Sequence, residues 1–339
     1  YLLKEKGYKV TGLFMQNWQN EPGEKCTSEI DFKDASSVCD RLEIPLHTAN
    51  FSDDYWNNVF EEFLNEYKLG RTPNPDILCN REIKFKSFLN YALTIGADYI
   101  ATGHYASLKN INDKTYLSRA KDIAKDQTYF LHEVKEPEFK KCIFPLENIM
   151  KSDVRKIAKE IGLSVSSKKD SVGICFVGEK NMKDFLGRFI KLEKGPILDE
   201  DNNIIGEHNG STLYTIGQRQ GLQIGGIKDK DDLPWYVYKK DILKNYIFVC
   251  QGVNNNLLYS KGLECEDISW INNDYDFDSI ECMIQIRHQH EPVNCQIDYL
   301  NDRYVIKFNK PIRGVALGQS AVFYKKNICM GGGVISRAF

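Results

Sequence analysis

The chain has 339 residues, of which 42% are hydrophobic and 27% are charged, and its formal net charge is −2. This length predicts two or three domains with a sizeable core, and no apolar run reaches the ~20 residues that span a membrane. The charge excludes a protein that is basic overall, so nucleic-acid binding would need a local basic face. The opening YLLKEKGYKV is charged and short, unlike a signal peptide.

Apolar residues recur at helical spacing in the first part of the chain and alternate with strand patterns. YLLKEKGY is typical of a helix end, and KVTGLFM follows as a strand. A helical pattern over 32–42 precedes the predicted strand IPLHTANF, and an amphipathic helix is predicted over 56–67.

The alternation continues up to about residue 162. A helix over 81–95 leads to the strand in ADYIATGHYA, and a further helix begins at Ser152, its predicted cap, and ends at Gly162. This order is typical of α/β proteins with a doubly wound parallel sheet. Ligands of such sheets bind beyond the carboxyl ends of the strands.

After about residue 180 helices become scarce, and short β-prone runs stand between Gly, Asn and Asp clusters. The runs are STLYTIG, PWYVYKK, NYIFVCQG, SIECMIQIRHQ, NCQIDYL, RYVIKF and SAVFYKK. They predict small β-rich modules with a sandwich or barrel at the C-terminus. We therefore expect an α/β domain over 1–180, a small β-rich central domain over 181–254 and a β-barrel over 255–339.

Ten cysteines are scattered along the chain, and no two have the C-x-x-C spacing of a structural zinc site. The scatter excludes a disulfide scaffold and favours a reducing compartment. We expect a cytoplasmic protein without a metal site, with the mitochondrial matrix as the alternative location. Cysteines in strand patterns, such as Cys250 in YIFVCQG, are expected to be buried hydrophobic residues.

The segment TPNPDILCN at 72–80 combines two prolines, a carboxylate and a thiol. Each residue before a proline favours extended backbone, so this loop is expected to be stiff. If Asn80 caps the following helix, Cys79 lies near a helix N-terminus, where a thiolate is favoured, and Asp76 could transfer protons. The alternative is a rigid turn that packs a hydrophobic cysteine against the sheet.

A second thiol, Cys175, lies in SSKKDSVGICFVGE. Lysines and glycines around a cysteine favour a reactive thiol over a buried one. Two thiols that meet at one site would suit sulfur or disulfide exchange. The alternative is a buried cysteine beside an exposed basic turn.

Other segments carry polar groups without a distinctive pattern. Gly103 in ATGHYA ends a predicted strand and permits close approach of a ligand. QIRHQHEP, expected on a β segment, offers a cationic, stackable group suited to RNA, or else a solvated barrel face. The polar residues in these and nearby segments are Lys125, Asp126, Gln127, Arg287, His288, His290 and Gln319.

Together these segments resemble the tRNA-specific 2-thiouridylase family along essentially the whole chain. The motifs are GLFMQNW, NVFEEFLNEYKLGRTPNPDILCNREIKF, GADYIATGHYA, KDQTYFL, KDSVGICFVGE, YTIGQRQGL, PWYV, GQSAVFY and GGGVI. The resemblance implies an ATP-pyrophosphatase-type N-terminal domain, a small central domain, a C-terminal β-barrel and a monomer.

The resemblance also implies a reaction, the replacement of the C2 oxygen of the wobble uridine in certain tRNAs by sulfur. ATP, with Mg²⁺ as counter-ion, would adenylate that oxygen, and a persulfide sulfur would then displace AMP. Cys175 would carry the persulfide received from a sulfur-donor or sulfur-relay protein. Cys79 would complete the transfer by forming a disulfide with Cys175, and Asp76 would be the local acid or base.

Ligand contacts follow from the same matching motifs. Met15 and Gly103 would line the adenine pocket, and Asn74, Pro75 and Asp76 would hold a flipped-out base. The positions that match tRNA contacts are His104, Lys125, Asp126, Gln127, Arg287, His288 and Gln319.

The chain departs from the family pattern in two respects. A Ser-Gly-Gly-x-Asp-Ser-Ser phosphate loop is absent and is expected directly before Tyr1, so we expect a truncated sequence that binds ATP poorly and has little activity. A titration of this chain that gave micromolar ATP affinity would contradict that expectation. His288 stands where family members often have Tyr.

Three alternatives stay open at this point. Another ATP-pyrophosphatase enzyme would make a different thionucleoside or act without tRNA. A non-enzymatic tRNA-binding protein would lack the phosphate loop even upstream of Tyr1. A redox protein using Cys79 and Cys175 alone would leave the KDQ segment and the barrel unexplained.

Overall fold

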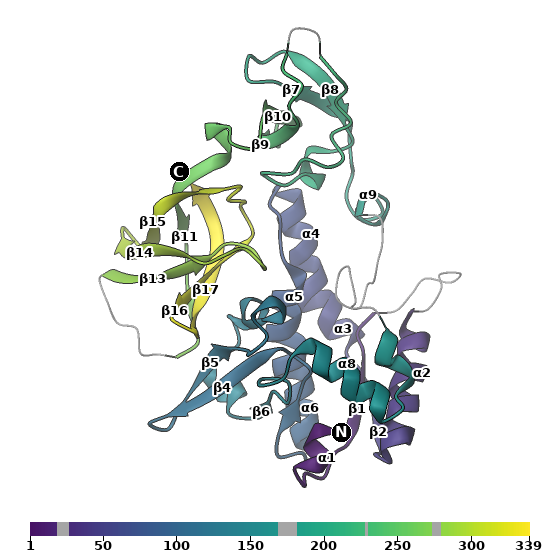
Figure 1. Ribbon diagram of the computed structural model, residues 1–339. Helices are drawn as coiled ribbons and strands as arrows, with labels where there is room; N and C mark the ends of the chain where they lie inside the picture. The colour runs from purple at the N-terminus through teal and green to yellow at the C-terminus, as the bar shows by residue number, and fades with distance from the viewer. Residues whose placement is uncertain (19–26, 169–181, 228–229, 273–278) are drawn as a thin grey trace.

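The structure, a computed structural model, describes residues 1–18, 27–168, 182–227, 230–272 and 279–339. Helices and short parallel strands form one part of the molecule, the strands β7–β10 form a second, and a barrel forms a third (Figure 1). No helix among the described residues is long and apolar enough to cross a membrane.

The helices lie mainly in the first half of the chain. Two of them are extended by the π-helical segments Trp56–Phe60 and Cys79–Ser87, so that 52–68 and 75–94 are each continuous. The helices are α1 (Leu2–Glu5), α2 (Thr27–Leu42), α3 (Ser52–Tyr55), α4 (Glu61–Lys68), α5 (Pro75–Leu78), α6 (Phe88–Thr94), α7 (Glu136–Phe139), α8 (Lys151–Glu160) and α9 (Met182–Leu186).

Parallel pairing confirms the predicted α/β class of the first part. Strand β1 (Gly12–Gln16) pairs in parallel with β2 (Leu46–Asn50), and α2 connects them. Strand β3 (Ile100–Ala101) pairs in parallel with β6 (Cys142–Ile143). Parallel neighbours need a crossover connection, which the helices between them supply.

The structure differs from the sequence-based expectation in two details of the first part. Ser152 lies inside α8, whose N-cap is Met150 and has no side-chain cap. A hairpin that the sequence analysis did not predict follows β3, with strands β4 (Ala106–Ile111) and β5 (Lys114–Arg119). Its turn residues Asn112 and Asp113 both have positive φ, as a two-residue hairpin of type I′ requires.

The central strands form a four-stranded sheet in the order β8-β7-β10-β9. They are β7 (Gly195–Leu198), β8 (Ile204–His208), β9 (Trp235–Asp241) and β10 (Tyr246–Gln251). Alternate residues such as Val237, Ile247 and Val249 are fully buried in its core. The run STLYTIG is a 3-10 turn at Ser211–Leu213 and not a strand, which corrects that prediction.

The C-terminal strands close into the predicted barrel in the order β11-β15-β14-β13-β16-β17, and β17 pairs back to β11. They are β11 (Tyr259–Cys265), β13 (Ser279–Gln285), β14 (Val293–Leu300), β15 (Arg303–Arg313), β16 (Ser320–Lys325) and β17 (Ile328–Ala338), with the short β12 (Ser269–Trp270) on β17. Strand β5 also pairs with β17, so the hairpin from the first part extends the barrel sheet.

Candidate functional site

The segment Thr72–Asp76 leads directly into a helix. The side-chain oxygen of Asn74 accepts a hydrogen bond from the Asp76 N–H at 3.2 Å, and Pro75 occupies the first helical position. Proline suits that position because the N–H it lacks would have no partner within the helix. Asn74 is therefore the cap, and the predicted cap Asn80 is wrong: the Asn80 amide lies inside the helix and donates to the Phe130 carbonyl at 2.9 Å.

Cys79 lies one turn into this helix and not on the loop. Its backbone N–H donates to carbonyls of the first helical turn, and its side chain is fully buried. Asp76 precedes Cys79 by three residues, a spacing that places both on one helix face. Cys79 belongs to an apolar cluster that includes Tyr55, Phe60 and Phe63.

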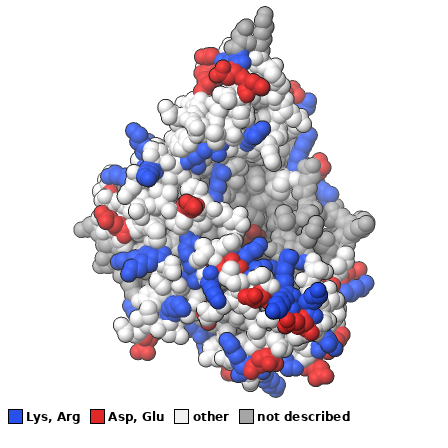
Figure 2. Space-filling model, viewed as in Figure 1, with Lys and Arg blue, Asp and Glu red and all other residues white. Residues whose placement is uncertain are grey.

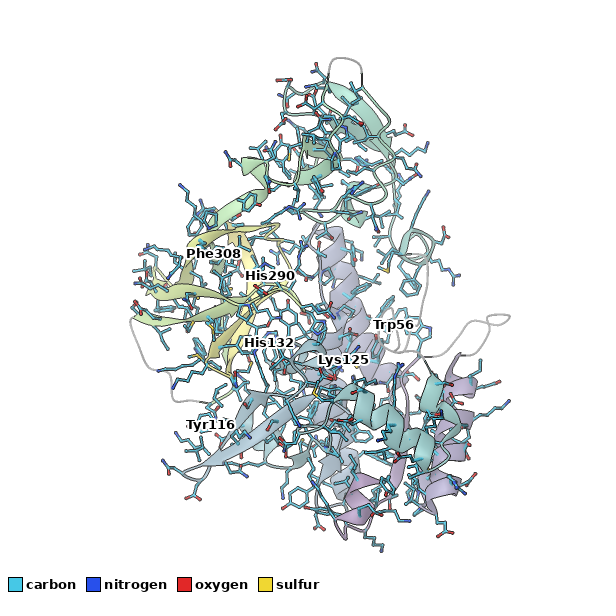
Figure 3. The ribbon with its side chains drawn as sticks, in the orientation of Figure 1. Trp56, Tyr116, Lys125, His132, His290 and Phe308 are labelled. Atoms are coloured by element: carbon cyan, nitrogen blue, oxygen red, sulfur yellow. The ribbon has the colours of Figure 1, made fainter. Side chains whose placement is uncertain are left out.

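The carboxyl end of β1 borders the same cluster. Met15, half-buried on β1, packs against it. Trp18 stacks on Trp56, which lies on the side of the helices away from the barrel (Figure 3). Asn17, which directly precedes Trp18 in the sequence, is 2% exposed. Neither polar atom of its side-chain amide has a hydrogen-bond partner in the described part of the chain. Asn17 is not among the predicted site residues, although a polar residue directly after a strand of a parallel sheet is a usable signal.

The residues after β3 combine an open backbone with a buried imidazole. Gly103 is exposed, and no atom lies within 4 Å of the place where a side chain would begin. The Nδ1 atom of His104 lies 2.8 Å from the Thr102 hydroxyl. Burial, with a smaller contribution from Lys84, lowers the pKa of His104 well below its usual value. His104 is therefore a neutral hydrogen-bonding group at neutral pH.

Two buried imidazoles predict a loss of stability in mild acid. Burial lowers the pKa of both His104 and His132 below 6.5. The unfolded chain then binds more protons than the folded one below that pH, so stability is present above about 6.5 and is lost as pH falls. We expect each histidine to reduce the free energy of unfolding by up to about 1.4 kcal/mol per pH unit.

Thermal unfolding between about pH 7.5 and 5.5 measures this loss. The variant His104→Gln is expected to show a shallower dependence on pH than the wild type. Replacement of His47, which is exposed on β2, is the matched control. An unchanged slope in His104→Gln would contradict the prediction.

The Lys125-Asp126-Gln127 segment joins the first part of the chain to the barrel. The buried Asp126 carboxylate accepts hydrogen bonds from Arg119 at 3.1 Å, from the Ala120 N–H at 3.1 Å and from the Thr128 hydroxyl at 2.6 Å. The Gln127 side chain accepts from the Tyr105 N–H at 3.0 Å. Lys125 is half-buried and lies beside the helices of the first part in Figure 3.

Arg287, His288 and His290 lie in the turn after β13, which ends at Gln285, and not on a strand as predicted. The Arg287 Nη2 atom donates to the carbonyls of Ile216 and Gly314, each at 2.7 Å. The His288 Nε2 atom lies 3.1 Å from the Asp126 carbonyl, and its ring lies 4.5 Å from that of Phe130. Gln319 donates from Nε2 to the Thr72 carbonyl at 2.7 Å. These side chains thus contact protein backbone or rings.

Cys175, Lys169 and Asp170 lie outside the described residues. The chain reaches them from Lys168, which forms exposed ion pairs with Asp31 at 2.8 Å and Asp34 at 2.6 Å on α2. In the described part of the chain, no group of three His, Cys, Asp or Glu side chains could hold a metal ion.

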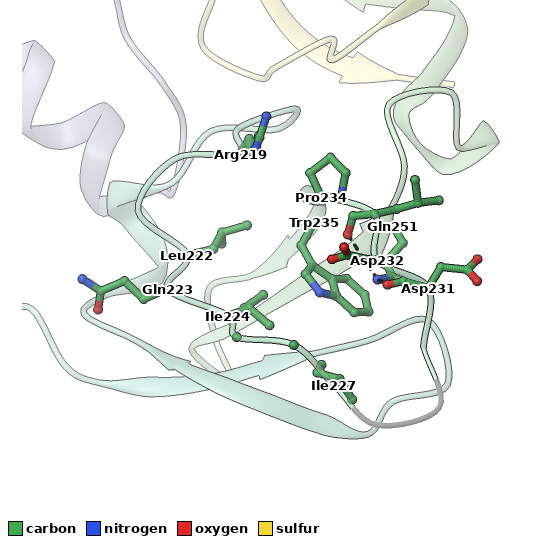
Figure 4. A pocket seen from close by; sticks show the side chains of 13 residues that line it. Arg219, Leu222, Gln223, Ile224, Ile227, Asp231, Asp232, Pro234, Trp235 and Gln251 are labelled. Carbon is green, nitrogen blue, oxygen red and sulfur yellow. Dashed lines mark hydrogen bonds between the residues drawn. The ribbon is translucent and has the colours of Figure 1, made fainter.

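A hollow of about 340 Å³ lies on the central strands (Figure 4). Trp235, Leu222 and Ile224 supply apolar lining, and Asp231 and Asp232 lie at one side. It contains none of the predicted site residues. Figure 2 shows acidic side chains gathered at this end of the molecule, whereas lysines and arginines are numerous lower on the same face.

Three family models match successive parts of the chain. Residues 1–179 are similar to the "tRNA methyl transferase HUP domain", residues 183–251 to the "tRNA methyl transferase PRC-barrel domain" and residues 260–335 to the "Aminomethyltransferase beta-barrel domain". The first of these matches covers more than half of the chain.

Curated relatives match the chain almost from end to end. A protein of Buchnera aphidicola subsp. Schizaphis graminum is 50% identical over 339 residues, 99% of this chain and 92% of the relative. Relatives from Legionella pneumophila (strain Lens) and Salmonella typhimurium (strain LT2) are 48% and 47% identical, with 99% of this chain covered and 94% and 92% of the relatives. All three are named tRNA-specific 2-thiouridylase MnmA.

Proposed function

The chain belongs to the family of tRNA-specific 2-thiouridylases, and we propose that it replaces the C2 oxygen of the wobble uridine by sulfur through Cys79, Cys175 and Asp76. The observation that carries the proposal is the likeness to 2-thiouridylases over 99% of the chain. The capped helix supports it further, because it presents Asp76 and Cys79 on one face directly after the proline-rich loop.

The reaction is proposed in three steps with balanced bonds. The C2 oxygen of the uracil first attacks the α-phosphorus of ATP, and pyrophosphate leaves. The terminal sulfur of a Cys175 persulfide then attacks C2, the C2–O bond breaks and AMP leaves. Finally the Cys79 thiolate attacks the Sγ atom of Cys175, the S–S bond to the transferred sulfur breaks and C2 keeps that sulfur. The remaining Cys79–Cys175 disulfide is reduced by an external thiol.

The residues that lead into the helix are proposed to hold the extruded base. Asn74, Pro75 and Asp76 are half-buried, and they form the capped start of the helix, which suits a pocket for a flipped nucleotide. Asp76 would move the proton of Cys79, because the two share a helix face. Met15 and Gly103 are proposed to contact the adenine of ATP. Mg²⁺ is proposed to arrive with the phosphates of ATP as their counter-ion.

Partners and organisation follow as further proposals. The protein would bind tRNA, receive sulfur from a donor or relay protein, act as a monomer and comprise domains 1–180, 181–254 and 255–339. The bacterial relatives support a cytoplasmic location over a mitochondrial one. Of the seven residues that match tRNA contacts, five are proposed to contact tRNA directly: His104, Lys125, Asp126, Gln127 and His288. The other two, Arg287 and Gln319, donate to protein carbonyls.

The test uses protein expressed from its complete reading frame. The protein is incubated with unmodified tRNA, ATP and a persulfide donor, and digested tRNA is analysed for nucleosides by mass spectrometry. We expect 2-thiouridine that depends on ATP and on the donor. tRNA binding without any thionucleoside would identify a binding protein, and a different thionucleoside would identify another modifying enzyme.

Asn17 is proposed to contact the bound nucleotide or base through its buried amide. A buried amide without partners lowers stability by about 1–3 kcal/mol, and a protein retains one where a ligand completes its hydrogen bonds. Asn17→Leu is therefore expected to raise the free energy of unfolding of the ligand-free protein by about 1 kcal/mol and to lower thiolation at least about tenfold. Urea unfolding and the thiolation assay measure the two effects. A variant with full activity would exclude the contact.

A further inference from the structure

The loop before the capped helix is held by two other parts of the chain. The Thr72 N–H donates to the Leu317 carbonyl at 2.8 Å, and the Thr72 carbonyl accepts from Gln319 Nε2 at 2.7 Å. The Thr72 hydroxyl lies 3.1 Å from the hydroxyl of Thr215 in the central part. Thr72 is thus fixed from the barrel side and from the central side, two residues before Asn74.

The barrel and the central part are joined to each other at the same place. Arg287 Nη2 bridges the carbonyls of Ile216 and Gly314, and Arg313 Nη2 donates to the Gly217 carbonyl at 3.3 Å. Hydrogen bonds from a charged group are stronger than neutral ones. The bridge to Ile216 therefore fixes the residue next to Thr215 relative to the barrel.

Close backbone approach shows that this junction is tightly packed. Gly318 has φ +85°, and a Cβ atom there would lie 2.7 Å from the Cβ atom of Arg71 and 2.8 Å from the Thr72 nitrogen. A Cβ atom on Gly217 would lie 3.2 Å from the Gly314 Cα atom. The motifs YTIGQRQGL and GQSAVFY, which the proposed chemistry does not use, supply these contacts.

We propose that Gln319 and Arg287 are positioning residues that set the Thr72–Asp76 segment relative to the barrel and the central strands. The inference rests on the proposed function and deepens it. A tRNA bound across all three parts then meets a base-holding segment that is already in place. A displacement of about 1 Å in such a segment can reduce the rate about a hundredfold. Both side chains would act through Thr72 or Thr215 and not by reading the RNA.

The first experiment compares Gln319→Ala and Gln319→Glu in single-turnover thiolation and in tRNA binding. In both variants we expect the rate constant at saturating tRNA to fall about tenfold to a hundredfold, with Kd for tRNA changed less than about twofold. Glutamate cannot donate to the Thr72 carbonyl, so it should behave like alanine. The matched control is Gln296→Ala, because the Gln296 amide donates to its barrel neighbours Ser279 and Asp298, away from Thr72.

A direct tRNA contact by Gln319 makes the opposite prediction. Gln319→Glu would then weaken binding more than Gln319→Ala and change its salt dependence, while the rate at saturating tRNA stayed unchanged. That outcome would overturn the inference. Wild-type protein without any 2-thiouridine would instead overturn the proposed function.

Further variants keep the test decisive if Gln319→Ala folds poorly. Thr72→Val and Thr215→Val each remove one hydroxyl of the 3.1 Å contact at nearly constant volume. We expect a severalfold fall in rate for each and non-additive effects in the double variant, since both act on one contact. Arg287→Lys should retain more activity than Arg287→Met, because lysine can still donate to the Ile216 carbonyl. Full activity in all of these variants would contradict the positioning role.

Discussion

Replacement of Cys79 by alanine is expected to reduce the release of 2-thiouridine at least about a thousandfold when no external thiol is present. Without the Cys79 thiolate, the transferred sulfur stays bonded to Cys175, and tRNA remains attached to the protein through a C2–S–S–Cys175 bridge. The adduct should be visible on a non-reducing gel. Added dithiothreitol should cleave the bridge and release 2-thiouridine.

Alanine is the better substitution because Cys79 is fully buried in an apolar cluster. Alanine removes the sulfur atom without introducing a hydroxyl into that apolar cluster. Cys142→Ser is the matched control: burial raises the pKa of the Cys142 thiol to about 12, and its Sγ atom already donates to the Glu138 carbonyl at 2.9 Å. Normal release of 2-thiouridine by Cys79→Ala would show that Cys79 only fills space.

Periodicity predicted the helices and the fold class because the buried faces repeat along the chain. The helix over 56–67 buries Val59, Phe60, Phe63 and Leu64 at the expected spacing. The predicted cap Asn80 is wrong because the two prolines favour extended backbone and so predict a loop throughout TPNPDILCN. The Asn-Pro pair is itself a start signal, since Asn74 accepts from Asp76 N–H and proline follows at the first helical position.

The candidate site could be predicted only in part. Sequence motifs identify its residues, but they do not identify the residues that each of these contacts in the folded chain. Arg287 contacts a carbonyl 71 residues away, and Gln319 contacts one 247 residues away. No local pattern encodes such pairs. The motifs therefore predict both side chains as tRNA contacts. The β4–β5 hairpin was missed although its Asn112-Asp113 turn is a local signal.

The second large effect concerns Arg119, whose loss leaves Asp126 buried without its cation. The guanidinium donates to Asp126 at 3.1 Å and to Gln285 on the barrel at 2.8 Å, and lies 3.9 Å from the ring centre of Tyr324. The two side chains are 10% and 3% exposed. Removal of one partner of a buried ion pair lowers stability by about 3–5 kcal/mol. We expect that loss for Arg119→Met in urea unfolding followed by circular dichroism.

The pH dependence of this loss separates charge from packing. Burial already raises the pKa of Asp126 above 3.8, although the Thr128 and Ala120 hydrogen bonds and Arg119 oppose the rise. Without Arg119 the folded-state pKa rises further. The variant is then most stable relative to wild type at acidic pH, where Asp126 binds a proton, and loses stability as pH rises through the folded-state pKa.

The double variant Arg119→Met/Asp126→Asn tests this explanation, because no carboxylate remains to be buried. We expect it to recover part of the lost stability and all of the altered pH dependence. Arg303→Met is the control: its 3.5 Å pair with Glu264 is half-exposed, and such pairs contribute at most about 1 kcal/mol. If Arg119→Met and the double variant lost the same stability at every pH, packing on Tyr324 and not the buried charge would hold the hairpin to the barrel.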